Sequence, residues 1–198
     1  TMQITSDSMA GRVVVFDSII DEIPGGVALN VARLDNEREG KEFIEPGTPV
    51  YVDYAARTAE VCKTALAIDG GLTAAPRISK NNHFLVGDIL NDGTTGGMIT
   101  AIDRDSSDDY DTVTLNANLT YAAGTKYFEG SATGTSDVLK YTPNGLIKSV
   151  SRIKEGNAEV SVVTMGAVRE DALTYPMPTL FKTALRSATG TSLITFFD

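Results

Sequence analysis

The chain is poor in the residues that most often carry catalysis or bind transition metals. Its 198 residues include one cysteine, Cys62, one histidine, His83, and no tryptophan. A lone cysteine excludes an intramolecular disulfide and a paired-cysteine metal or redox site, and it indicates a reducing compartment. Cys62 lies in an Ala/Val-rich stretch typical of a small buried hydrophobe, and His83 lies in a polar loop that predicts a partly exposed imidazole. We therefore predict no enzyme and no cofactor.

Basic residues are also scarce. The chain has 17 Lys and Arg residues and 26 Asp and Glu residues, which gives a net charge of -9. This balance argues against non-specific binding to nucleic acid or to an anionic membrane, because both need clustered positive charge. No apolar run approaches the ~18 residues of a membrane span. The N-terminus shows no basic stretch followed by an apolar core, so we expect no signal peptide.

What the chain does contain is short alternating runs between turns, which is typical of β-strands. Residues 113–119 alternate strictly between apolar and polar side chains. Residues 13–20 are a dense β-branched run that suits either a buried strand or an apolar strip awaiting a partner. Residues 178–186 show helical spacing after a proline, and residues 193–197 form a last strand. The pattern predicts a mainly β fold with one short C-terminal helix.

The distribution of strand and turn signals along the sequence divides the chain into two parts. Residues 1–12 are polar and predict an extended arm. Residues 76–143 form a separate run of strand and turn signals, which we interpret as an inserted small β-barrel-like domain. The remaining residues, 1–75 plus 144–198, then make up one compact β domain.

One acidic loop, residues 103–111, has the carboxylates that a calcium site needs. It does not fit the EF-hand pattern counted from Asp103, because Asp108 stands at the glycine position and Thr114 at the bidentate glutamate position. A solvated hairpin tip is the better interpretation, and we predict no metal. The later cluster Arg169, Glu170 and Asp171 is interpreted as a surface turn whose charges pair with each other or with a neighbouring subunit.

Three ordered stretches resemble the lambda-type capsid decoration proteins of tailed phages. Residues 46–53, PGTPVYVD, resemble the early strand of that family. Residues 144–147 and 160–163 resemble its following strands. Residues 166–176, GAVREDALTYP, resemble the segment that precedes its helix and final strand. An Ile-Pro-Gly-Gly turn at residues 23–26 is similar to the front of phage head-fibre proteins.

The resemblance implies a virion structural protein on the outer surface of the capsid, made in the cytoplasm of a bacterial host. It implies a homotrimer bound to the major capsid protein, with an N-terminal arm that reaches the shell. The residues that it nominates for the capsid or trimer interface are Val13, Val14, Val15, Phe16, Arg169, Glu170 and Asp171.

A second hypothesis is a ligand- or carbohydrate-binding β-module that acts through the inserted domain, which could also touch a host surface. It predicts an exposed aromatic platform near Tyr110, Tyr121, Tyr127 or Phe128. A hydrolase would require a pocket that holds His83 against carboxylates.

Overall fold

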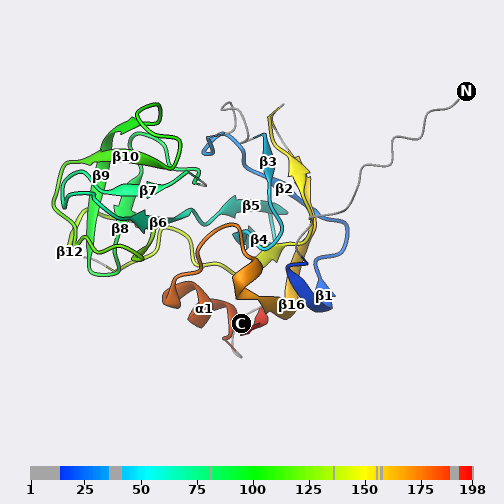
Figure 1. Cartoon of the computed structure of the whole chain (residues 1–198). Coiled ribbons are helices and arrows are strands. Elements are labelled where there is room, and N and C mark those ends of the chain that lie inside the picture. The colour runs from blue at the N-terminus through cyan, green and yellow to red at the C-terminus, as the bar shows by residue number, and fades with distance from the viewer. Residues whose placement is uncertain are drawn as a thin grey trace, which may run out of the picture.

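A computed structural model of the chain describes residues 14–35, 42–80, 82–135, 137–154, 156, 158–187 and 192–197. The arm expected at residues 1–12 lies outside these residues. The described chain is mainly β, with 45% strand and 6% helix, and its sheets are curled. The predicted fold class, mainly β with one short C-terminal helix, is confirmed. Figure 1 shows two lobes side by side, with the small lobe in green and the helix α1 below the junction.

The larger lobe is built on an eight-stranded sheet, called here the large sheet. Seven of its strands follow the order β1, β16, β13, β4, β5, β2, β15, and β17 pairs with β16 in parallel. A two-stranded ribbon of β3 and β14 lies outside this sheet. The strands are β1 (Phe16–Glu22), β2 (Val27–Leu29), β3 (Phe43–Ile44), β4 (Pro49–Asp53), β5 (Thr58–Val61), β13 (Gly145–Ile147), β14 (Ser151–Arg152), β15 (Ala158–Val160), β16 (Val162–Arg169) and β17 (Leu193–Phe197).

The smaller lobe is a seven-stranded sheet, called here the small sheet, that closes on itself. Its order is β10, β7, β6, β11, β8, β9, β12, and an additional pairing of β10 with β9 closes a ring of six antiparallel strands. This is the barrel-like architecture predicted for the insert. The strands are β6 (Thr64–Ile68), β7 (Arg77–Ser79), β8 (Ile89–Asn91), β9 (Thr95–Asp103), β10 (Tyr110–Leu115), β11 (Lys126–Glu129) and β12 (Gly134–Thr135).

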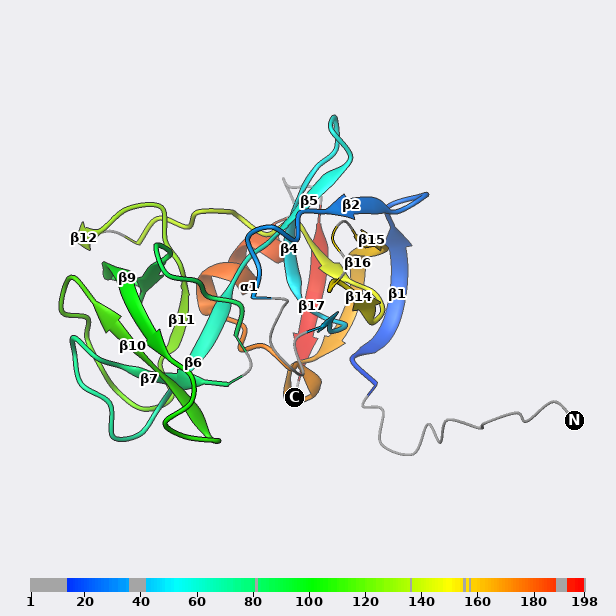
Figure 2. The same cartoon turned by 90° about the horizontal axis from the view of Figure 1, so that it is seen from above.

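The chain passes between the lobes at two places. It enters the small sheet between β5 and β6, through Cys62 and Lys63, and it returns before β13. Figure 2 shows β6 extending from the junction into the small lobe. Because β6 pairs with β7 and β11, small-sheet structure begins at Thr64, whereas the sequence pattern placed the start of the insert at residue 76.

The turn at Pro46 and Gly47 packs against segments from both the N-terminal and the C-terminal part of the chain. Gly47 has a positive φ of 80°, which favours glycine, and its N–H donates to Ile147 O at 2.8 Å. A Cβ at this position would lie 2.8 Å from Val15 Cγ1 and still closer to the side chain of Leu173. The turn therefore needs glycine for its conformation and also for the close packing of two distant segments.

Three apolar clusters stabilise the lobes. One lies among the strands of the large sheet, and one fills the small sheet. The third lies under α1 (Thr179–Leu185) and contains Phe181, Leu185, Ile194 and Phe128. Since Phe128 belongs to β11 of the small sheet, its side chain connects the two lobes by apolar contact.

Two sequence expectations about single residues are tested by burial. Cys62 is buried as predicted, and that burial raises the pKa of its thiol well above the usual value. The prediction of a partly exposed His83 was wrong: the imidazole is buried at the lobe junction, with Nε2 2.8 Å from the Tyr175 hydroxyl and Nδ1 3.2 Å from Asp35 O.

In the part of the chain that the structure describes, no helix has the length and apolarity to cross a membrane.

Candidate functional site

The most unusual surface of the large lobe is its edge strand, β1. Within the described residues this strand pairs only with β16, and the pairing shifts register at three points. Its five central residues, 17–21, are all exposed, including Ile19 at 40% and Ile20 at 70%. A strand with one covered face would alternate between buried and exposed side chains. The described part of the run at residues 13–20 is therefore divided: Val15 is buried and Phe16 is partly buried, whereas Ile19 and Ile20 are exposed apolar side chains.

The structure brings the two nominated segments together, although they are far apart in the sequence. The Arg169 N–H donates to Val15 O at 2.9 Å, and Phe16 lies opposite Val168 in the ladder of β1 and β16. The start of β1 therefore lies beside the end of β16 (Figure 2). Their adjacency results from strand pairing, which no local pattern reveals.

The nominated residues of the first segment have different environments. Val13 lies outside the described residues. Val14 is 64% exposed and is available for contact. Val15 is buried and Phe16 is partly buried, and both pack against the cluster under α1. Their side chains thus pack against the core of their own chain, and their place at an interface stays a prediction.

The charged turn begins where β16 ends and forms a short 3-10 helix, η1 (Glu170–Ala172). Arg169 Nη2 and Asp171 Oδ2 are 2.8 Å apart, and both side chains are exposed. This agrees with the interpretation of a surface turn whose charges pair with each other. The pair lies beside the edge strand and can exchange its partners for those of another subunit.

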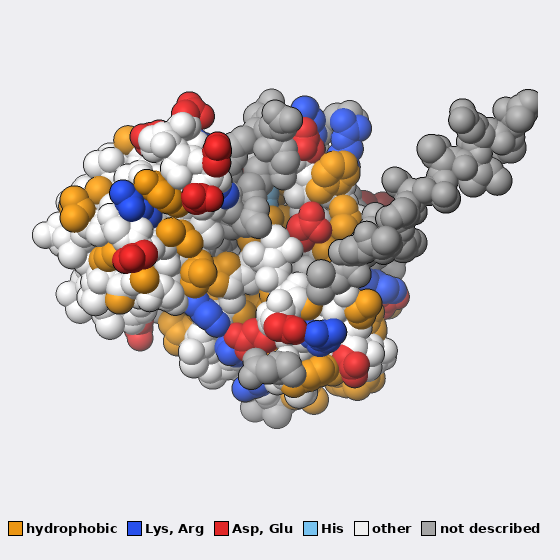
Figure 3. Space-filling model, in the orientation of Figure 1, with side chains coloured by type: hydrophobic (Ala, Val, Ile, Leu, Met, Phe, Trp, Pro, Cys, Tyr) orange, Lys and Arg blue, Asp and Glu red, His pale blue; other side chains and the backbone are white. Residues whose placement is uncertain are grey.

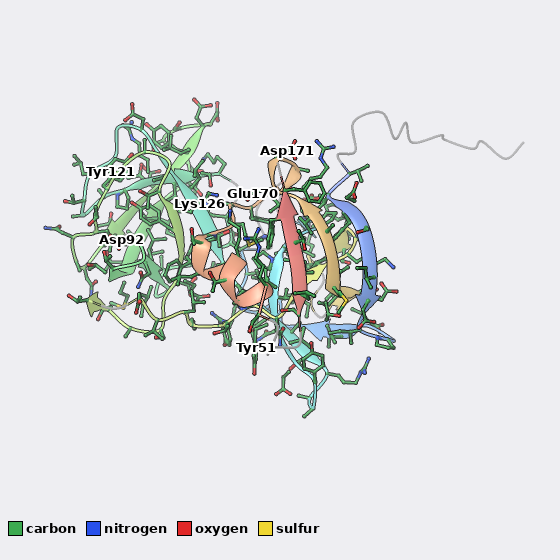
Figure 4. All side chains as sticks on the ribbon, turned by 90° about the horizontal axis from the view of Figure 1, so that it is seen from below. Tyr51, Asp92, Tyr121, Lys126, Glu170 and Asp171 are labelled. Carbon is green, nitrogen blue, oxygen red and sulfur yellow. The ribbon has the colours of Figure 1, made fainter. Side chains whose placement is uncertain are left out.

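Glu170 does not take part in the pair formed by its neighbours and binds two lysines from other elements instead. Its carboxylate accepts hydrogen bonds from Lys182 Nζ of α1 at 2.7 Å and from Lys126 Nζ of β11 at 3.0 Å. Lys126 also donates to Met177 O at 3.3 Å. Figure 4 shows Lys126 and Glu170 facing each other between the small sheet and the large sheet. Glu170 therefore links the two lobes within its own chain, and its place at an interface stays a prediction.

This bridge predicts a dependence of stability on pH. Partial burial opposes the charged form of Glu170, but the hydrogen bonds from Lys182 and Lys126 outweigh it and lower the pKa of the carboxyl. A lowered pKa contributes stability above the unfolded value of 4.5, and that contribution is lost as pH falls through the folded value. We expect a Glu170→Gln variant to be less stable than wild type at pH 7 and to differ less below pH ~4. Urea unfolding at the two pH values measures this, and an unchanged difference would contradict it.

Sequence reasoning missed a second exposed apolar strip, on the outer face of β17. Leu193 and Phe197 are 45% and 37% exposed, and Leu193 lies opposite Met165 of β16. Figure 3 shows apolar side chains at the surface near the C-terminal end of the chain, in the lower part of the molecule. The sequence did contain a signal for this strip. Leu193, Thr195 and Phe197 alternate with buried residues along β17, so their side chains share the outward face, and two of the three are apolar.

The acidic loop of residues 103–111 joins the paired strands β9 and β10 and is exposed at its tip, but the carboxylates at its two ends are bound. Asp103 accepts hydrogen bonds from the Asp105 and Ser106 N–H groups of its own turn, at 3.1 and 3.2 Å. Asp111 is buried and is bound by Lys80, Asn82 and Arg104, so the expected solvated tip is wrong at this end of the loop. Among the described residues no group of three or more His, Cys, Asp or Glu side chains could hold a metal ion.

The aromatic platform predicted for the small sheet does not form. Tyr127 and Phe128 are buried. The Tyr121 hydroxyl donates to Ile68 O and accepts from the Gly71 N–H. Tyr110 is half-buried, and its ring is covered by the Arg77 guanidinium at 4.4 Å.

Comparisons of the chain with protein-family models, with curated proteins and with solved structures find no match.

Proposed function

We propose that this protein is a structural subunit of a phage virion, a capsid decoration or head-fibre protein. In this proposal it binds the shell of major capsid protein as a homotrimer, and it performs no catalysis. The ordered sequence stretches motivate the proposal. The observation that carries it is the exposed edge strand β1, which presents Ile19 and Ile20 beside the exposed Arg169–Asp171 pair and whose outer backbone edge no described strand covers.

An exposed strand edge is a template for pairing with another chain, and such pairing gains affinity from main-chain hydrogen bonds. Proteins that remain monomeric usually protect such edges with charges and bulges. In β1 the bulges are present and Asp17 and Asp21 supply charge, yet two isoleucines remain exposed. The edge thus suits a specific partner that covers the isoleucines and tolerates the irregular register.

The test is the mass of the protein in solution, by size-exclusion chromatography with light scattering. We expect wild type to have three times the chain mass of 21.0 kDa. An Ile20→Lys variant should shift toward the monomer, because it places a charge in the surface that the trimer would bury. A Leu72→Lys variant is the matched control, because Leu72 is equally exposed, at 69%, but belongs to the small lobe. It should stay trimeric.

A second measurement addresses the capsid. Purified particles of a phage that encodes this chain should contain it in stoichiometric amounts, detected by mass spectrometry. A monomer at every concentration, absent from such particles, is the result that would overturn the proposal.

A further inference from the structure

A lysine and an aspartate form a buried ion pair in the junction where the chain enters the small sheet, and a glutamate lies opposite the lysine in the ladder. The side chain of Lys63, between β5 and β6, is 0% exposed, and its Nζ contacts Asp88 Oδ2. Asp88 immediately precedes β8, and its side chain is 11% exposed. Its Oδ2 also accepts the Leu85 N–H at 2.8 Å, which fixes the carboxyl group against the amine.

Glu129, the last residue of β11, is the third member. Its N–H donates to Lys63 O at 3.1 Å, so the two residues lie opposite each other and their side chains share a face of the sheet. Glu129 Oε1 accepts from Arg33 Nη2 at 2.5 Å and from Lys140 Nζ at 2.6 Å. Its Oε2 is buried and accepts no hydrogen bond within the described part of the chain. One carboxylate oxygen is thus held fixed while the other remains available.

The electrostatics favour a reactive lysine. Burial lowers the pKa of Lys63, although Asp88 and Glu129 oppose this effect. A lowered pKa increases the fraction of neutral amine, which is the nucleophilic form. A buried ion pair is also costly to hold, because two charges have left water for a medium of low dielectric constant. A reaction that removes both charges relieves that cost.

We propose that Lys63 and Asp88 become joined by an intramolecular isopeptide bond, formed without a co-reactant and with Glu129 as the proton relay. The Lys63 ammonium first gives one proton to the paired Asp88 Oδ2, and the lone pair of the resulting amine attacks Cγ of the neutral carboxyl group; the Nζ–Cγ bond forms and the Cγ–O bond to the protonated oxygen breaks. Of the three ammonium hydrogens, one stays on the amide nitrogen and two leave with the carboxyl oxygen as water. Glu129 Oε2 takes a proton from the attacking nitrogen and returns it to the departing oxygen.

Proximity supplies the driving force that a free amine and a free carboxylate lack in water. Well-oriented intramolecular reactions reach effective molarities of about 10⁵–10⁸ M, and both groups here are fixed by burial and by hydrogen bonds. The bond would link the entry point of the small sheet to the start of β8. It would therefore close a covalent loop within the small lobe, close to the junction with the large lobe.

The test is the intact mass of the full-length chain, measured after denaturation. We expect wild type to be lighter than its sequence by one water molecule, and Lys63→Met to have the full sequence mass. The Asp88→Asn variant should lose one ammonia instead, because the leaving group changes from oxygen to nitrogen. Glu129→Gln should keep the full mass while circular dichroism shows the wild-type fold, a result that a merely structural role of Glu129 does not produce.

Two further measurements locate the bond. Lys148→Met is the matched control, since Lys148 pairs with Glu22 at the surface, and it should retain the mass deficit. Proteolysis should yield a branched peptide that joins residues 63 and 88 and resists hydroxylamine. A wild-type chain of full sequence mass overturns the proposal. So does a water loss at Asp69–Gly70 or Asp92–Gly93 that hydroxylamine removes, because that is a succinimide.

The bond should also appear in thermal stability. Covalent closure of a loop of this size lowers the entropy of the unfolded chain as a disulfide does, so we expect Glu129→Gln to melt about 5–15 °C below wild type. Reducing agent should leave the wild-type melting temperature unchanged, because an amide is not reducible by thiols.

Discussion

An Asp111→Ala variant is expected to lose about 3–5 kcal/mol of unfolding free energy, the cost of breaking a buried ion pair from one side. The Asp111 side chain is 0% exposed. It binds Lys80 Nζ at 3.0 Å, Arg104 Nη1 at 2.8 Å and Asn82 Nδ2 at 2.9 Å. Alanine leaves two partly buried cations, Lys80 at 28% and Arg104 at 19% exposure, without this carboxylate. Their desolvation is then no longer offset.

The measurement is urea unfolding at pH 7, followed by circular dichroism. Asp108→Ala is the control, because Asp108 lies in the same acidic loop but is exposed, and it should change stability by no more than about 0.5 kcal/mol. Equal losses in the two variants would mean that the loop acts through its total charge. A loss confined to Asp111 would show that one buried network holds the base of the hairpin.

The elements that local patterns predict well are those with an uninterrupted period. The alternation at residues 113–119 predicted a strand, and it is confirmed only over residues 113–115: β10 ends at Leu115, with Val113 and Leu115 buried, and residues 116–119 lie outside any strand. The apolar spacing after Pro178 predicted the helix, and α1 spans Thr179–Leu185 with Phe181 and Leu185 on its buried face. In both cases the period itself determines which side chains face the core.

Burial of single polar residues could not be predicted, because it depends on partners far away in the chain. His83 lies in a polar stretch that predicts exposure, but Tyr175 and Asp35 cover it. Asp111 ends an acidic run that predicts a wet hairpin tip, but Lys80 and Arg104 neutralise it. The contacts that decide burial are tertiary contacts.

The candidate site was predictable only in part. The apolar run at residues 13–20 left open whether the strand is buried or exposed. Among the described strands β1 pairs with β16 only, which makes it an exposed edge. Arg169 and this run were both nominated for an interface, but neither the resemblance nor any spacing predicted that they are adjacent. The isopeptide triad gave no signal at all, because Lys63, Asp88 and Glu129 are brought together by the closure of the small sheet.

The start of the small sheet was also hidden from the pattern. Residues 58–68 contain no glycine or proline, so no turn residue in the sequence marks the change of sheet. The structure places β5 in the large sheet and β6 in the small sheet, with Cys62 and Lys63 between them. A strand changes sheets by exchanging its hydrogen-bond partners, which requires no turn residue.

A Phe128→Ala variant is expected to lose about 3–5 kcal/mol of unfolding free energy and to uncouple the two lobes. Phe128 belongs to β11 of the small sheet, yet its buried ring packs in the cluster under α1. Its centroid is 6.1 Å from that of Phe181, with the planes tilted by 47°. Truncation leaves a cavity at the point where apolar packing crosses the junction. The polar links through Glu170 and His83 then have to hold the lobes with less support.

Differential scanning calorimetry measures both effects, since a wild type that unfolds in one transition should give way to two in the variant. Phe43→Ala is the control, because Phe43 is 45% exposed and its loss should change stability by about 0.5 kcal/mol or less. A double-mutant cycle with Phe181→Ala should give a coupling of about 0.5–1.5 kcal/mol, as aromatic pairs do. A single transition with no coupling between the two rings would contradict the prediction. The lobes would then be joined mainly by their ion pairs, and acid should separate them before heat does.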